Sequence, residues 1–188
     1  MHTVNPEALS PPLNFNFATC VLDDWAAHAP EANALWYVDP TSGVELKLTF
    51  SQIAAQSCQA ANFMCRAGIR QGDRVLVMLP RIPQWWVSML GLIRLGAVPV
   101  PATLLLTARD VAYRLETARI SAVITSVDGI EKVDGYKGIL LVVGGLQTGW
   151  QDKFAGSSPG VNSTHYPLHS ARPPPPKRME RYFLLSSR

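Results

Sequence analysis

The apolar stretch LPRIPQWWVSMLGLIRLGAVPVP, residues 79–101, constrains the fold most, with four prolines and only two charges. Pro83 suits the first helical position, where an N–H would be unpaired, and Gly96 suits the residue after a helix. Arg94 places a cation near the negative end of the helix dipole. The pattern therefore predicts a helix over 83–95, about 20 Å long. A bilayer core is about 30 Å thick, so we expect no membrane span.

Strand-like segments flank this helix. RVLVML (74–79) precedes it and AVPV (97–100) follows, which predicts two parallel strands joined by a right-handed crossover. The helix is apolar nearly all round and should be buried on more than one side. Trp85 and Trp86 could line a ligand site, but core packing is the favoured interpretation.

The remaining pattern alternates between helix and strand periods. Helices are expected over 17–28, from a Ser51 cap to Ala67 with Gly68 after its end, and from the capping box Thr107–Asp110 to about Ala118. Strands are expected over 34–38, 44–50, 121–126 and 139–143, with a hairpin turn at DPTSG (39–43).

This alternation predicts an α/β fold: a partial doubly wound, mainly parallel sheet with flanking helices and an N-terminal β-hairpin. We expect a flexible lead-in over 1–13 and an incomplete subdomain over 14–154. Residues 155–188 are rich in Pro, Ser and Arg and have no sustained period. They are expected to form a disordered C-terminal tail or to be read out of frame.

The charge distribution and the cysteines exclude several classes of function. The net charge is +3, but residues 155–188 carry +4, so the body is at −1. No basic face is therefore expected for nucleic acid. Three cysteines without paired spacing predict neither disulfides nor a metal site. No secretory signal opens the chain, and a cytoplasmic location is expected, with the mitochondrial matrix as the alternative.

Three short motifs fail on their chemistry. GSSPG (156–160) matches a nucleophile elbow, but Pro159 has no N–H for an oxyanion. GGLQTG (144–149) has phosphate-loop spacing, but Trp150-Gln151 follows where lysine and a hydroxyl are needed. The stretch from Pro173 to Arg178 resembles an SH3-binding segment, and a chance match is favoured.

No catalytic, cofactor-binding or metal residue is assigned. The acidic groups are interpreted as capping or solvated residues rather than acid/base pairs: Asp23, Asp24, Asp128, Glu131 and Asp134. The histidines show no metal spacing: His2, His28, His165 and His169.

Several motifs together resemble the N-terminal subdomain of the acyl-activating, adenylate-forming superfamily of AMP-dependent synthetases and ligases. They are KLTFSQI (47–53), GDRVLVMLP (72–80), IPQWW (82–86) and LIRLGA (92–97). PATLLLTARD (101–110), YRL (113–115) and GWQD (149–152) fit the medium-chain acyl-CoA synthetase subgroup. The resemblance covers about 14–154.

The resemblance implies a ligase that uses ATP, Mg²⁺ and coenzyme A. Such enzymes join a carboxylic acid to ATP, release pyrophosphate, and pass the acyl group from the adenylate to coenzyme A. The family's Ser/Thr/Gly-rich phosphate loop comes after the region matched here, so no catalytic role is carried over. Some relatives contact coenzyme A near the position of Leu105, but a leucine does not carry that polar role.

Two interpretations of function stay open. In the first, the chain is the N-terminal part of a medium-chain acid–CoA ligase and is inactive alone. In the second, it is a non-catalytic truncated product or an interaction module that uses its polyproline tail. A stand-alone nucleotide-binding Rossmann protein is disfavoured because LPRIP (79–83), not a Gly-rich turn, follows the first parallel strand.

Overall fold

The predicted β-α-β unit forms the centre of the molecule. In a computed structural model that describes residues 14–144 and the backbone of 181–184, β3 (Arg74–Met78) leads into α3 (Pro83–Leu95) and then β4 (Val98–Pro101). Gly96 ends α3 with a left-handed φ of 73°, as the sequence predicts. No helix of the described ranges is long and apolar enough to span a bilayer.

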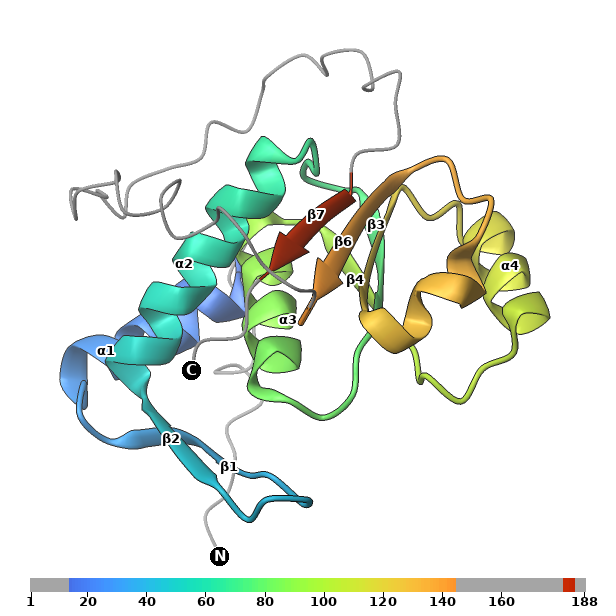
Figure 1. The fold of residues 1–188 in the computed structure, drawn as a ribbon. Helices are drawn as coiled ribbons and strands as arrows, with labels where there is room; N and C mark the ends of the chain where they lie inside the picture. Colours follow the sequence, from blue (N-terminus) through green and yellow to red (C-terminus); the bar gives the residue numbers. More distant parts are fainter. Residues whose placement is uncertain (1–13, 145–180, 185–188) are drawn as a thin grey trace, which may run out of the picture.

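Five parallel strands make the main sheet, in the order β4-β3-β5-β6-β7 (Figure 1). The further strands are β5 (Ala122–Ser126), β6 (Ile139–Val143) and β7 (Arg181–Leu184). Each strand pairs with its neighbour in continuous register, for example Leu76 opposite Val123 and Leu140 opposite Arg181. The expected doubly wound α/β fold is confirmed. The expected character of 1–13 and of 155–188, apart from the backbone of β7, lies outside the described residues.

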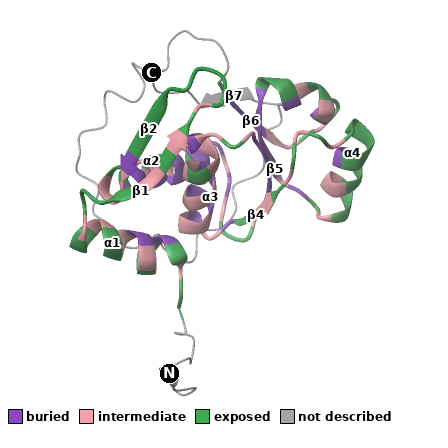
Figure 2. Cartoon of the chain, turned by 90° about the horizontal axis from the view of Figure 1, so that it is seen from below, coloured by how far each residue is buried: buried purple, intermediate pink, exposed green. Residues whose placement is uncertain are grey.

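Helices cover both faces of this sheet. On one face, α2 (Phe50–Arg66) and α3 pack over Val75, Val77 and Ile124. On the other, α4 (Ala108–Thr117) and the 3₁₀ helix η3 (Val127–Val133) pack over the alternate strand residues. Figure 2 shows the buried residues concentrated in the strands between these layers. Residues on both faces of the strands are buried, which explains their continuous apolar sequences.

The edge strand β4 is closed to further pairing by its prolines. The Val98 N–H donates to the O of Asp73, just before β3, at 2.8 Å, and the Ala102 N–H donates to Val77 O of β3 at 2.9 Å. Because backbone N–H groups alternate in direction along a strand, an N–H at position 99 or 101 would point away from β3. Both residues are proline and have no N–H. The outer side of β4 therefore has no N–H donors at these positions, which blocks strand addition at this edge.

The N-terminal hairpin lies apart from the main sheet (Figure 1). Strands β1 (Asn33–Val38) and β2 (Glu45–Thr49) pair antiparallel, with Trp36 opposite Lys47. The Lys47 ammonium lies 4.1 Å from the Trp36 ring centroid on the solvent side, and Leu48 on the other side is buried. The hairpin is therefore held by one face only.

The start of α2 differs from the predicted Ser51 cap. Thr49 is the N-cap, and its hydroxyl accepts from the Gln52 N–H while the Gln52 side chain accepts from the Thr49 N–H. This reciprocal pair satisfies two free amides, whereas Ser51 lies inside the first turn, where its hydroxyl bonds the Thr49 hydroxyl at 2.9 Å instead of capping an amide. The predicted capping box of Thr107 and Asp110 is confirmed at the start of α4.

The N-terminal segment is fastened to α3 by an ion pair. It begins as a π-helical turn, η2 (Ala18–Leu22), and continues as α1 (Asp23–His28). Both carboxylate oxygens of Asp23 accept from Arg94, each at 2.7 Å, and Arg94 also donates to Ser57 of α2. The Arg94 side chain is only 8% exposed. The bond between Asn16 Nδ2 and Ile93 O, at 2.7 Å, adds a second link.

Arg119 occupies a conformation that favours glycine. It follows the C-cap of α4 with φ at 50°, and its N–H donates to Glu116 O while the Ile120 N–H donates to Leu115 O, both at 3.0 Å. This is the Schellman arrangement, which glycine adopts after α2 (Gly68) and α3 (Gly96). A side chain at this φ strains the backbone.

Arg119→Gly is therefore expected to raise the free energy of unfolding by about 0.5–1 kcal/mol. The relief of strain exceeds the extra backbone entropy that glycine gives the unfolded chain. Urea denaturation measures the change. The matched control is Gly68→Ala, expected to destabilise because the same position of α2 has φ at 102° and a Cβ there would lie 3.3 Å from Ile139 Cδ1. A lower stability for Arg119→Gly would contradict this explanation.

Candidate functional site

The carboxyl edge of the parallel sheet is the candidate functional site. Ligands of doubly wound sheets bind outside the carboxyl ends of the strands, where neighbouring connections leave on opposite faces. Here the connection after β3 leads to α3 on one face, and β5 runs directly into η3 on the other. Because β3 and β5 are adjacent, the topological switch point lies between their carboxyl ends.

The loop after β4 borders this edge. Its Leu105 side chain is 90% exposed, although it is flanked by partly buried leucines. The Lys132 ammonium of η3 donates to the Leu104 carbonyl and ties the two connections together. The Lys132 contact was not predicted from the sequence, since no local pattern links residues 28 apart in the chain.

The end of β5 is tightly packed on its η3 side. Thr125 Oγ1 donates to Met78 O at 3.0 Å and joins the ends of β5 and β3. A Cβ at Gly129 would lie 2.0 Å from Thr125 Oγ1 and 3.0 Å from Met78 Cε, so only glycine fits there. The next side chain, Ser126, is buried, and its hydroxyl has no hydrogen-bond partner.

The two residues of the Trp pair differ in burial. Trp85 packs against the core cluster between the sheet and α2, as predicted. Its ring meets that of Trp86 edge-on, with 4.7 Å between the ring centroids. Trp86 is 48% exposed. The all-round burial predicted for α3 is therefore incomplete at this position, and Trp86 presents an aromatic surface near the start of the helix.

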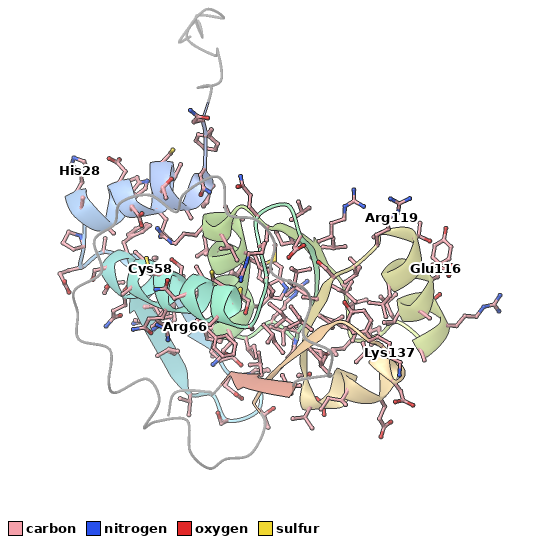
Figure 3. The ribbon with its side chains drawn as sticks, turned by 90° about the horizontal axis from the view of Figure 1, so that it is seen from above. His28, Cys58, Arg66, Glu116, Arg119 and Lys137 are labelled. Carbon is pink, nitrogen blue, oxygen red and sulfur yellow. The ribbon has the colours of Figure 1, made fainter. Side chains whose placement is uncertain are left out.

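The acidic residues do not assemble an acid/base pair. Asp23 binds Arg94, and Asp24 lies 3.3 Å from His28 on the surface of α1. Asp128, Glu131 and Asp134 are exposed along and just after η3. In the described ranges, no three metal-ligating side chains come together. Figure 3 shows His28 at the outer end of α1, apart from Cys58 on α2.

The shifted pKa values have structural causes. Hydrogen bonds from the Thr107 side chain and backbone lower the pKa of Asp110, which caps α4. Burial raises the pKa of the Cys58 thiol, and burial also raises that of Tyr136, whose hydroxyl donates to Ile120 O at 2.9 Å. These shifts reflect a cap and packing, and none marks a nucleophile or a general base.

The motifs rejected from the sequence lie almost wholly outside the described residues. They are GSSPG (156–160), the stretch from Pro173 to Arg178, and GGLQTG (144–149), of which only Gly144 is described. Gly144 follows β6 with φ at 79° and lies at the same carboxyl edge. The cysteines are free: Cys20, Cys58 and Cys65.

Comparison with known proteins shows a family match that covers most of this chain. The family model described as AMP-binding enzyme matches residues 22–184. A mitochondrial acyl-coenzyme A synthetase, ACSM5 of Rattus norvegicus, is 42% identical over 121 residues, which are 61% of this chain and 21% of that enzyme. Its human relative ACSM2B is 40% identical over 129 residues, 65% of this chain and 22% of the enzyme.

Solved structures agree with the sequence relatives. The fatty acyl CoA synthetase of Mycobacterium tuberculosis matches with a TM-score of 0.56 and 28% identity, covering 63% of this chain and 23% of its own. The acetoacetyl-CoA synthetase of Streptomyces lividans matches with a TM-score of 0.62 and 25% identity, covering 69% and 22%. The chain thus spans about a fifth of the length of the curated relatives it matches.

Proposed function

The chain belongs to the family of AMP-binding enzymes, and on that premise we propose that it forms the N-terminal part of an ATP-dependent carboxylic acid–CoA ligase. The observation that carries the proposal is the family match over residues 22–184, together with about 40% identity to two acyl-coenzyme A synthetases. The resemblance of residues 101–110 to the medium-chain subgroup supports medium-chain acids as the substrates.

The proposed reaction has two steps. The acid carboxylate attacks the α-phosphorus of ATP, forms the acyl-adenylate and releases pyrophosphate; the coenzyme A thiol then displaces AMP to give the thioester. The negative charge on the phosphoryl oxygens in the first step needs positioned hydrogen-bond donors, a lysine and Mg²⁺. The described residues bring together no three metal ligands, so they are not proposed to hold that ion.

We propose that the sheet positions those donors rather than containing them. Strand β7 pairs in parallel with β6, so its carboxyl end lies at the same edge as the ends of β3 and β5. In the resembled family the phosphate loop follows the region matched here. The pairing of β7 and the family match up to residue 184 favour counting 181–184 with the domain, which the sequence bounded at 154.

The location and the alternative function are also proposals. The relatives are named as mitochondrial enzymes. Their names support a location in the mitochondrial matrix for this chain, rather than the cytoplasm expected from the sequence. The alternative is an interaction module that uses the stretch from Pro173 to Arg178, which lies outside the described residues.

The purified 188-residue chain is expected to give no ATP–pyrophosphate exchange with butyrate to octanoate, because it spans only about a fifth of the length of the ligases it resembles. Incorporation of labelled pyrophosphate into ATP measures it, with the intact rat ACSM5 enzyme as the positive control. If the chain alone gives exchange, and this exchange requires the acid, then its own residues complete the adenylation site.

A further inference from the structure

One buried hydroxyl at the carboxyl edge has no partner. Ser126 is 8% exposed, and its Oγ is the buried side-chain polar atom without a hydrogen bond in the described part of the chain. Leaving such a group unpaired in the interior lowers the stability of the fold. Native structures rarely retain this cost unless a ligand, an ion or an ordered water meets the group.

The strand register fixes the face on which this hydroxyl lies. Ser126 pairs with Val143, and it continues the alternation of Ala122 and Ile124, which belong to the core under α2 and α3. On its other side β5 pairs with β3. There Thr125 lies opposite Met78, so the next residue of β3, Leu79, lies beside Ser126. The hydroxyl therefore lies among apolar side chains on the α3 side of the switch point.

The amino terminus of α3 lies at the same edge and on the same face. Ile82 and Trp85 pack against the cluster that contains Leu79 and Val143. Ile82 is the N-cap and gives no side-chain cap; Pro83 has no N–H, and the Trp85 N–H donates to Ile82 O at 2.9 Å. The Gln84 N–H remains as a first-turn amide without an intrahelical acceptor.

We propose that the Ser126 hydroxyl and the first turn of α3 form a binding site for a small oxyanion, a carboxylate or a phosphate, at the switch point between β3 and β5. Each part supplies a donor, and the helix dipole adds partial positive charge. Exposed Arg81, one residue before the N-cap, adds a cation from the same loop. Ser126 is also the N-cap residue of η3, but its side chain makes no capping bond.

The site goes beyond the proposed ligase function, and its test uses neither ATP nor coenzyme A. Amide NMR spectra of the ¹⁵N-labelled 188-residue chain are recorded while acetate or inorganic phosphate replaces chloride at constant ionic strength. Saturable shifts are expected at Gln84 and Ser126, with one of the two anions binding more tightly and so identifying the oxyanion. Ser126→Ala should weaken that binding about tenfold or more, since a hydrogen bond to a charged group is lost.

Two variants serve as controls. Ser121→Ala removes a hydroxyl at the opposite end of the same strand, where it donates to Arg74 O at 3.2 Å, and should leave the titration unchanged. Ser126→Thr keeps the hydroxyl and should keep binding, and it replaces the alanine variant if that fails to fold. The proposal would be overturned by shifts that do not saturate, or by a Ser126→Ala variant that binds the anion as tightly as the unchanged chain. A Ser126 hydroxyl found to cap η3 would also overturn it.

Discussion

Gly91→Val is expected to lower the free energy of unfolding by about 3 kcal/mol or more. A Cβ at this position of α3 would lie 2.9 Å from Ala60 Cβ, 3.1 Å from Ala61 N and 3.3 Å from Ser57 O. Two of these atoms are backbone of α2 and cannot move aside without separating the helices. Overpacking of a core costs about 1–3 kcal/mol, and backbone displacement adds to it.

Urea denaturation followed by tryptophan fluorescence measures this loss. Ala112→Val is the matched control, because it adds a β-branched side chain at an exposed position within α4. Its cost should stay within the helix-propensity difference, below about 0.7 kcal/mol. Equal effects of the two substitutions would mean that helix propensity, rather than the contact between α2 and α3, sets the loss at Gly91.

Asp23→Ala is expected to destabilise the chain by about 3 kcal/mol. The substitution leaves the Arg94 guanidinium, 8% exposed, without its carboxylate partner. Removing one member of a buried ion pair costs about 3–5 kcal/mol, and the partial exposure of Asp23, 34%, places the expectation at the lower end. Urea denaturation measures the effect, and proteolysis should cleave earlier before α2, since this pair fastens α1 to α3.

The double variant Asp23→Ala with Arg94→Met separates the ion pair from general damage. Replacing both charged partners by apolar groups should restore much of the stability, because no unpaired charge remains buried. Asp24→Ala is the matched control in the same first turn; Asp24 is exposed, and its contact with His28 should contribute less than about 1 kcal/mol. A double variant as unstable as the sum of both single variants would contradict a coupled pair.

The local elements were predicted where the signal is local. Pro83 and Gly96 bound α3 as the sequence predicted, and the capping box of Thr107 was correct, because each cap depends on residues within one turn. The cap of α2 was predicted wrongly at Ser51: both Thr49 and Ser51 can cap, and only the partner Gln52 selects Thr49. Arg119 was missed because the residue after α4 is not glycine.

The contacts between elements could not be predicted in the same way. Arg94 was interpreted as a cation on the helix dipole, yet it binds Asp23, 71 residues earlier in the chain. The constraint on Gly91 depends on how closely α2 crosses α3. The missing partner of Ser126 is visible only once both neighbouring strands are placed. Long-range packing decides these features, and the sequence pattern of a single element does not contain it.

The most direct test of the proposed function is a chimaera. Residues 14–144 replace the matching N-terminal segment of rat ACSM5, and ATP–pyrophosphate exchange is measured with acids from butyrate to octanoate. If this segment is the N-terminal part of such a ligase, the chimaera will exchange at a rate within about tenfold of the parent, and its Gly91→Val form will lose activity with its fold. A folded chimaera that binds ATP but gives no exchange with any of these acids would contradict the account.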